Sequence, residues 1–259
     1  MPAMALVRTE RRGAVAVVEL NRPDAGNALS NALVGELAHA LATGTVGARA
    51  VVVTGAGRHF CAGADLAELA AGAAAPEGER VADAMRLAAV YAELLRAPAF
   101  TVAAVQGAAF GGGAGLAACC DLVIAGPEAR FQFSETRLGF VPALISTFLP
   151  RRVAPALLAR LFLDPEPLGP EAARAAGLAD EIAAEPLAAA LARADEVAHK
   201  VAASAVAETK RLLLELTVPE LDARLAAAAR ANARQRVHPE CRRGLAEFLA
   251  TKRFPTWTE

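Results

Sequence analysis

The amino-acid sequence predicts an α/β fold in which a mostly parallel, buried sheet is followed by a helical C-terminal region. Two observations support this prediction. Valine-rich runs of strand length alternate with helical patterns over residues 1–190, and helical patterns fill residues 191–259. Strands separated by helices of this length are typical of crossover units with parallel strands. The predicted strands are Ala14–Leu20, Ala50–Thr54, Thr101–Val105 and Leu122–Ala125.

The predicted helices follow the spacing of apolar residues along one helical face. In the first part of the chain they cover Asn31–Ala42 and Arg80–Arg96, and a short helix begins near Gly113. The segment Gly72–Glu79 is small, polar and contains a proline, which predicts a mobile loop. The C-terminal helices are expected at Leu187–Lys200, Ser204–Leu216, Pro219–Arg236 and Pro239–Lys252. Their alanine-rich, apolar character predicts contact with a neighbouring subunit.

Composition excludes several classes of protein. The 27 Lys+Arg and 28 Asp+Glu residues give a formal net charge of −1, whereas nucleic-acid-binding domains show a basic excess. A hydrophobic content of 55% with 21% charged residues argues against disorder. The uncharged segment Ala97–Cys120 carries a triple glycine, so it is interpreted as strand, turn and helix start rather than a membrane span. We therefore expect no nucleic-acid partner and no membrane partner.

The cysteines and the N-terminal segment indicate a cellular compartment. Cys61, Cys119, Cys120 and Cys241 form no C-x-x-C pair, and the adjacent pair is a poor basis for disulfides. Buried free thiols are expected, because free cysteine behaves as a small hydrophobe. The N-terminus has no long apolar segment after a basic start, which predicts no signal peptide. A cytoplasmic protein is the expectation.

Two glycine-rich turns each follow a valine-rich strand, at 55–66 and 106–116. Glycine allows the backbone to approach a ligand closely and to adopt a positive φ. A helix that begins directly after such a turn offers free N–H groups and the positive end of its dipole. Two turns of this kind that face each other would form an oxyanion hole with two donors, suited to a carbonyl that gains negative charge.

Other interpretations of these turns have weaker support from spacing. The sequence contains no phosphate-binding G-x-x-x-x-G-K-[ST] motif and no G-x-S-x-G nucleophile motif. A loose dinucleotide-binding pattern at Gly113–Ala118 begins several residues after its strand. The isolated histidines show no metal-ligand spacing, so no metal site is expected; they are His39, His59, His199 and His238. Tight connections without any chemistry remain the structural alternative for each turn taken alone.

Several motifs occur together along the chain: Asn21-Arg22-Pro23 with Asn27-Ala28-Leu29, Phe60–Leu66, Gly111-Gly112-Gly113, and Phe133-Ser134-Glu135 with Leu138-Gly139. In order and spacing they resemble the enoyl-CoA hydratase/isomerase family, the crotonases, from about residue 6 to Trp257. The resemblance implies a crotonase-type spiral of ββα repeats and an acyl-CoA thioester substrate. It also implies no metal or redox cofactor, since coenzyme A is part of the substrate, and a homotrimer or homohexamer.

The resemblance further implies which residues form the site. The oxyanion-hole amides fall on Ala64 and Gly112, and Glu135 is the acid–base carboxylate. The Arg22–Gly26 turn would line coenzyme A mostly through backbone groups, and Lys252 or Arg253 would meet a phosphate. The acyl group would lie against residues 66–90, Phe140 and Leu144. The implied substrate-binding residues are Ala25, Gly63, Ala64, Asp65, Leu66, Ala67, Gly112 and Lys252.

One position departs from the pattern of the family's hydratases, which generally place two glutamates around the substrate double bond. The first of them falls on Gly115 here, and the second is Glu135. Two carboxylates can hold one water and share the roles of base and acid. With one carboxylate, Glu135 must both receive and return a proton. Asp121 and Glu128 lie nearby in the sequence, but we expect them at a helix end and in a loop, so neither is nominated.

The sequence therefore favours an enoyl-CoA hydratase, with three alternatives left open. They are a Δ3-Δ2 enoyl-CoA isomerase, another enolate chemistry such as decarboxylation, and a non-catalytic acyl-CoA-binding homologue. Gly115 favours the isomerase or the binding protein, and Glu135 disfavours the binding protein. The segments 110–120 and 134–146 are similar to bacterial methylglutaconyl-CoA hydratase-type members, whose substrates carry a carboxylate. Arg137 is a candidate partner for such a group, unless it forms an ordinary surface or interface salt bridge.

Overall fold

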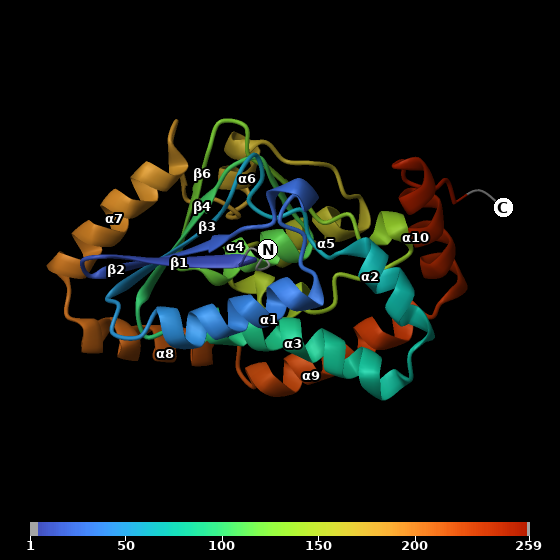
Figure 1. The fold of residues 1–259 in the computed structure, drawn as a ribbon, viewed down its shortest axis with the longest axis horizontal. Coiled ribbons are helices and arrows are strands. Elements are labelled where there is room, and N and C mark those ends of the chain that lie inside the picture. Colours follow the sequence, from blue (N-terminus) through green and yellow to red (C-terminus); the bar gives the residue numbers. More distant parts are fainter. Residues whose placement is uncertain (1–4, 258–259) are drawn as a thin grey trace.

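The computed structural model of the protein describes residues 5–257 and contains a six-stranded sheet in the order β1-β2-β3-β4-β6-β8 (Figure 1). β1 runs antiparallel to β2, and the other neighbours in this sheet are parallel. A second parallel pair joins β5 to β7. The strands are β1 Val7–Arg12, β2 Val15–Leu20, β3 Ala50–Gly55, β4 Phe100–Val105, β5 Ala108–Phe110, β6 Leu122–Ala125, β7 Arg130–Gln132 and β8 Glu181–Ile182.

Many of the helices begin at residues that are favoured at a helix N-terminus. The hydroxyl of Ser30 accepts a hydrogen bond from the Leu33 N–H at 3.2 Å and so caps α1, and Asp65 caps α2 in the same way. Prolines occupy the first turn of α5, α6, α7 and α10, where no N–H is needed. The helices are α1 Asn31–His39, α2 Leu66–Ala71, α3 Glu77–Arg96, α4 Gly112–Cys119, α5 Pro155–Leu163, α6 Pro170–Ala175, α7 Pro186–Lys200, α8 Ala203–Thr217, α9 Leu221–Arg236 and α10 Pro239–Thr251.

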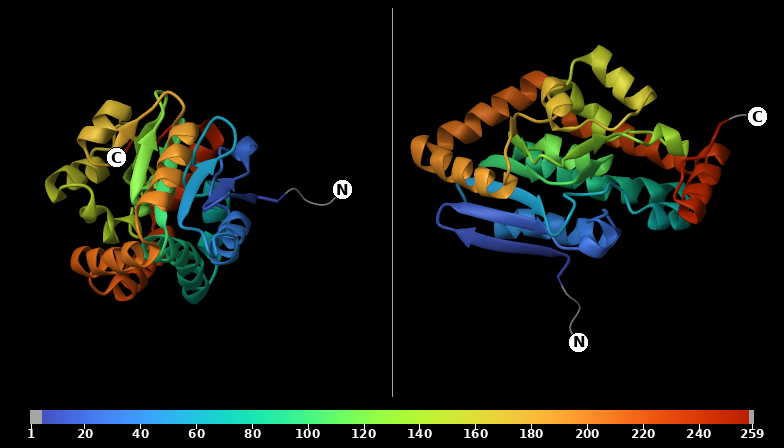
Figure 2. Two further views of the ribbon diagram at one scale, coloured as in Figure 1. Left: turned by 90° about the vertical axis from the view of Figure 1, so that its left-hand side faces the viewer. Right: turned by 90° about the horizontal axis from the view of Figure 1, so that it is seen from above.

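The central sheet is buried on both faces. In β3, Val51 and Val53 belong to a hydrophobic cluster shared with α1, α3 and α4, whereas Ala50 and Val52 pack against Ala190 and its neighbours on α7. Successive side chains of a strand point to opposite faces, so the valine-rich runs serve two cores at once. The sheet therefore lies between α7 on one face and the layer of α1 and α3 on the other (Figures 1 and 2).

The four predicted strands are confirmed, and their predicted bounds lie within one residue of those in the structure. The predicted helices are also confirmed, although α1 ends at His39 and continues as a π-helical turn over Ala40–Gly44. β1 was not predicted, because most of its residues are charged and exposed at the edge of the sheet. The short strands β5, β7 and β8 have too few residues to show a period.

The predicted mobile loop at Gly72–Glu79 is wrong in its second half. Gly72–Ala74 forms a single 3-10 turn, and α3 begins at Glu77, directly after Pro76. Glu77 and Glu79 lie in the first turn of α3, where carboxylates stabilise the helix through its dipole. The proline therefore marks a helix start rather than a loop.

The C-terminal helices divide between the sheet and the rest of the core. α7 covers the sheet, α9 packs along α3, and α10 packs against α2 and the turn at residues 136–138 (Figure 2). Among the described residues no helix is both long and apolar enough to cross a membrane, and Ala97–Cys120 is divided among β4, β5 and α4. All four cysteines are buried and free, as predicted.

Candidate active site

A cavity of about 590 Å³ lies where the two glycine turns meet α2, α9 and α10. Apolar side chains line most of it, as is typical of sites for small molecules. A larger hollow of about 730 Å³ lies at the turn between α8 and α9, but no predicted site residue lines it. Of the Arg22–Gly26 turn, only Ala25 lines the 590 Å³ cavity. The implied catalytic and substrate-binding residues that line it are Ala25, Gly63, Ala64, Asp65, Leu66, Ala67, Gly112, Glu135 and Lys252.

The two glycine turns lie directly against each other. The Phe110 N–H donates to the Cys61 carbonyl at 3.0 Å. Gly63 has φ +95°, and a Cβ at this position would lie 2.7 Å from the Phe110 carbonyl oxygen and 3.9 Å from the Gly111 nitrogen. A side chain at residue 63 would thus push the turns apart. Glycine at this position brings Ala64 and Gly112 to the same wall of the cavity.

The backbone N–H groups of Ala64 and Gly112 are free to bind a ligand. Neither donates a hydrogen bond to another protein group within residues 5–257. Leu29 forms hydrogen bonds with the residues on both sides of Ala64: its N–H donates to the Gly63 carbonyl, and its carbonyl accepts from the Asp65 N–H. The Ala64 N–H therefore points away from Leu29. Gly112 is the first residue of α4 and has no helical acceptor. This arrangement is what a two-donor oxyanion hole requires.

Glu135 provides a carboxyl group beside these amides. It precedes the 3-10 turn Thr136–Leu138, and its Oε1 lies so close to Gly111 that a Cβ there would approach it to 2.8 Å. Its Oε2 is buried and has no hydrogen-bond partner in the part of the chain described. Burial raises the pKa of Glu135 from 4.5 to about 7. A carboxyl group with such a pKa can both take up and return a proton near neutral pH.

The structure leaves no room for a second carboxylate at position 115. A Cβ on Gly115 would lie 2.4 Å from Ile145 Cγ2 and 3.3 Å from the hydroxyl of Tyr91. Tyr91 is fully buried on α3, lines the cavity, and donates a hydrogen bond to the Gly112 carbonyl at 2.9 Å. Tyr91 and Ile145 therefore occupy the space beside Gly115, and Tyr91 also fixes the first residue of α4.

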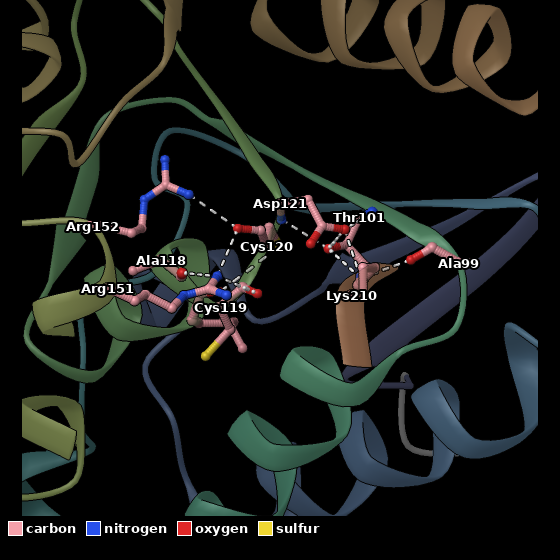
Figure 3. Close-up of polar contacts among 10 residues, drawn as sticks. Ala99, Thr101, Ala118, Cys119, Cys120, Asp121, Arg151, Arg152 and Lys210 are labelled. Carbon is pink, nitrogen blue, oxygen red and sulfur yellow. Dashed lines mark hydrogen bonds and ion pairs between the residues drawn. The ribbon is translucent and has the colours of Figure 1, made fainter. Parts of the chain in front are cut away.

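The far end of α4 is held by positive charge (Figure 3). One nitrogen of Arg151, Nη2, donates to the carbonyls of Ala118, Cys119 and Cys120 at 2.8, 3.0 and 3.1 Å. Arg152 adds a bond to the Cys120 carbonyl at 3.2 Å. Cations at the C-terminus of a helix complement its dipole, as does negative charge that develops at the N-terminus. The two arginines thus support the end of α4 opposite to Gly112.

The acidic residues near α4 in sequence take no part in the cavity. Asp121 Oδ2 accepts hydrogen bonds from the N–H and the hydroxyl of Thr101, both at 2.8 Å, and from Lys210 Nζ at 2.6 Å (Figure 3). It therefore connects β4 to α8. Glu128 lies exposed in a turn. Both positions agree with the expectation of a helix end for Asp121 and a loop for Glu128.

Polar contacts order the wall that the resemblance assigns to coenzyme A. Asp65 caps α2 and pairs with Arg22 Nη1 at 2.7 Å, which joins the Arg22–Gly26 turn to the first glycine turn. Lys252 ends α10 with φ +60° and reaches the same cavity, whereas Arg253 is not among the lining residues. Within residues 5–257 no group of three or more His, Cys, Asp or Glu side chains is placed to hold a metal ion.

The C-terminal tail returns to the segment that carries Glu135. The guanidinium of Arg137 lies 3.8 Å from the ring centroid of Phe254, and Phe254 itself lines the cavity. Trp257 donates from Nε1 to the Arg137 carbonyl at 3.3 Å and lies under the guanidinium of Arg243. Arg137 therefore holds the tail and is not among the residues that line the cavity.

Sequence reasoning missed several cavity residues. Tyr91 is the only tyrosine of the chain, yet its place on α3 gave no signal beyond core packing. Others come from α9, α10 and the tail, more than 80 residues after Glu135, and their spacing carries no motif. The missed residues that lie outside the recognised motif segments include Tyr91, Asn232, Phe248, Leu249 and Phe254.

Comparisons with known proteins agree with this geometry. The model of the enoyl-CoA hydratase/isomerase family matches residues 10–259. The "Putative enoyl-CoA hydratase" of Thermus thermophilus is 41% identical over 180 residues, which cover 69% of this chain and 71% of that protein. The crystal structure of an enoyl-CoA hydratase/isomerase from Mycobacterium paratuberculosis superposes with a TM-score of 0.85 at 28% identity, covering 95% of this chain and all of that one. An enoyl-CoA hydratase from Mycobacterium avium gives a TM-score of 0.83 at 31% identity, covering 99% and 100%.

Proposed function

This chain belongs to the enoyl-CoA hydratase/isomerase family and has its crotonase fold, and from that premise we propose that it adds water to the double bond of a 2-enoyl-CoA thioester. The observation that carries the proposal is the placement of the Glu135 carboxyl in the cavity that Ala64 and Gly112 also line. Within residues 5–257, one oxygen of this carboxyl is buried without a hydrogen-bond partner, and the two amides donate to no protein group. Coenzyme A enters as part of the substrate, and no further cofactor takes part.

The proposed reaction needs one base and one oxyanion hole. The thioester oxygen accepts hydrogen bonds from the Ala64 and Gly112 N–H groups, and these strengthen as an enolate forms. Ionised Glu135 takes a proton from the water that attacks C3, and the same carboxyl group then delivers a proton to C2. The product gains one water, and Glu135 is ionised again at the end.

A second candidate function is Δ3-Δ2 isomerisation, and Gly115 is the observation that favours it. A single carboxyl group suffices to move a proton between two carbons of an enolate, with no water involved. The two candidates are distinguished by a panel of 2-enoyl-, 3-enoyl- and glutaconyl-CoA thioesters. We expect mass spectrometry to show a gain of one water on the 2-enoyl substrates. Conversion of 3-enoyl substrates without any hydrated product would support the isomerase instead.

The pH dependence of hydration should follow Glu135. Because the carboxyl group must be ionised to accept a proton, kcat/KM is expected to rise with pH and to level off above the pKa of about 7. Below that value we expect about a tenfold loss for each further pH unit. Initial rates on crotonyl-CoA between pH 5 and pH 9 measure this profile. A flat profile across pH 7 would contradict the role of Glu135 as the base.

Replacing Tyr91 with Phe should lower kcat about tenfold and leave KM nearly unchanged. The variant removes the hydrogen bond to the Gly112 carbonyl, and Gly112 supplies an amide that binds the transition state more strongly than the substrate. Phe148 contacts the Tyr91 ring edge-on, with centroids 5.2 Å apart, so Phe148→Leu is the matched control. The control should lower Tm and spare kcat. A kcat that falls equally in both variants would assign Tyr91 a packing role alone.

We also propose that the chain assembles as a homotrimer or homohexamer. Leu212, Leu213 and Leu216 on α8 are 53%, 54% and 78% exposed, and exposed apolar patches mark protein interfaces. Light scattering at micromolar concentration should give the mass of a trimer or hexamer. The double variant Leu212→Glu, Leu216→Glu should lower that mass, because residues four apart share one helical face. A native chain that stays monomeric would contradict the proposal.

We propose a cytoplasmic location as well. The four cysteines are buried and unpaired, which suits a compartment where thiols remain reduced.

A further inference from the structure

One polar side chain lies among the apolar residues that surround the acyl end of the cavity. Asn232 is the residue of α9 that lines the cavity, and it is 8% exposed. Its neighbours in the lining include Leu69, Leu87, Phe140 and Leu144, the region that the family resemblance assigns to the acyl chain. Asn232 also borders a chamber of about 70 Å³ that shares these neighbours. A buried amide in such surroundings requires hydrogen-bond partners.

The orientation of the Asn232 amide is determined by Arg236. Arg236 Nε donates to Asn232 Oδ1 at 3.0 Å. A guanidinium can only donate, so the amide must present its oxygen to Arg236 and its NH₂ group on the other side. The Asn232 Nδ2 group has no protein partner among the described residues. It is therefore a donor that remains available to a ligand.

Arg236 is itself immobilised. It is 6% exposed, and its Nη1 pairs with Asp83 on α3, which also accepts from Arg86 at 2.7 Å. This chain of contacts ties α9 to α3 behind the cavity. The amide of Asn232 is thus pre-oriented, and a pre-oriented donor discriminates strongly between ligands that satisfy it and ligands that do not.

The charges around the 70 Å³ chamber indicate which kind of ligand oxygen the Asn232 amide can bind. Three carboxylates line the chamber, those of Asp65, Glu68 and Asp83, against the single guanidinium of Arg236. Asp65 and Asp83 pair with arginines, whereas Glu68 accepts from the Asn31 N–H at 2.7 Å. A carboxylate on the substrate would be repelled by these three carboxylates. An uncharged oxygen is therefore the better acceptor for the Asn232 amide.

We propose that Asn232 selects acyl chains that carry an uncharged oxygen, a hydroxyl or a ketone, beyond the reacting double bond. This inference rests on the proposed function, because it names the class of 2-enoyl-CoA that the cavity accepts. The Nδ2 group donates to the oxygen of the chain, while a plain hydrocarbon chain leaves it unpaired. We expect the oxygenated chain to be favoured about ten- to hundredfold in kcat/KM.

The test compares 2-enoyl-CoA substrates of six to eight carbons in matched sets: a hydrocarbon chain, the same chain with a hydroxyl or keto group, and the same chain ending in a carboxylate. Asn232→Asp keeps an oxygen toward Arg236 and replaces the donor with a negatively charged acceptor, and Asn232→Leu removes the amide without adding charge. Both variants should lose the preference for the uncharged oxygen, and Asn232→Leu should retain or improve turnover of the hydrocarbon chain. Gln132→Leu is the matched control. Gln132 lines the same cavity, but its Nε2 already donates to the Pro165 carbonyl at 3.0 Å, so the preference should persist.

Calorimetry with the saturated acyl-CoA counterparts separates this inference from the proposed function, because binding needs no chemistry. A wild type that hydrates no substrate yet binds the hydroxylated chain more tightly than the hydrocarbon chain, and loses that difference in Asn232→Leu, would remove the hydratase proposal alone. Equal handling of hydrocarbon and oxygenated chains by the wild type would overturn the inference about Asn232. A preference that survives Asn232→Leu, or a preference for the carboxylate chain, would overturn it as well.

Discussion

Replacing Glu135 with Gln is expected to lower kcat about 10²–10⁴-fold while the affinity for an acyl-CoA thioester changes little. Gln keeps the size and the hydrogen bonding of the side chain but cannot accept the proton that water must give up, and a positioned acid–base group contributes about that factor. Single-turnover rates on crotonyl-CoA measure the chemical step, and calorimetry with acetoacetyl-CoA measures binding. Undiminished turnover would leave only the oxyanion hole at Ala64 and Gly112 to explain activity.

The same variant should be more stable than the native chain above pH 7, which excludes unfolding as the cause of lost activity. Burial raises the pKa of Glu135 from 4.5 to about 7, so ionisation is harder in the folded state than in the unfolded state. The stability that the neutral carboxyl group contributes is complete below pH 4.5 and is lost as the pH rises to about 7, for a total of about 3 kcal/mol. Thermal unfolding at pH 5 and pH 8 should show a much larger gain for Glu135→Gln at pH 8 than at pH 5.

Introducing a carboxylate at position 115 is expected to damage the enzyme rather than to improve it. In Gly115→Glu the new Cβ would approach Ile145 Cγ2 to 2.4 Å, and Ile145 is 2% exposed and β-branched, so it cannot move aside easily. Overpacking of this kind costs about 1–3 kcal/mol. We expect a lower Tm and a loss of hydration, because α4 carries both Gly115 and the amide of Gly112.

A second substitution tests the reason for that damage. Ile145→Ala removes the methyl group that would clash with a side chain at position 115. Measured against Ile145→Ala alone, the double variant Gly115→Glu, Ile145→Ala should therefore not show the loss of stability that Gly115→Glu causes in the native chain. If a second carboxylate improves the holding of water, the double variant should also hydrate crotonyl-CoA faster relative to isomerisation. If Gly115→Glu alone had an unchanged Tm and hydrated crotonyl-CoA faster, packing would not be the reason for glycine at position 115.

The parts of the fold that follow from sequence are those in which local pattern and tertiary environment agree. β3 is buried at every position, and β4 at every position but Phe100, because both faces of the sheet are covered, and their valine-rich runs are typical of such strands. Prolines at the start of α7 and α10 locate those helices to within one residue. β1 shows no alternation of apolar and polar residues, because it lies at the exposed edge of the sheet, where charged side chains prevent pairing with other strands. Its pairing with β2 depends on a tight turn at Gly13 rather than on its own composition.

The site divides in the same way. Ala64, Gly112 and Glu135 belong to short segments that resemble the family's motifs, so the resemblance could assign them, and glycines in the two glycine turns are needed for close backbone approach. Asn232 and Phe254 reach the cavity only because α9 and α10 fold back over the first half of the chain. Nothing local in their surroundings distinguishes them from surface helix residues. Contacts of such long sequence separation require the three-dimensional structure.

The position of Trp257 gives this protein a built-in optical reporter. It is the only tryptophan of the chain, so the indole emission of the whole molecule comes from one ring. That ring donates a hydrogen bond to the Arg137 carbonyl, two residues after Glu135, and is 40% exposed, and Phe254, the nearest aromatic residue in the tail, lines the cavity. A thioester that enters the cavity and shifts the tail changes the hydration of the indole, and hence the wavelength of its fluorescence. Titrations can therefore be read without any label, provided that affinity tags are attached to the N-terminus.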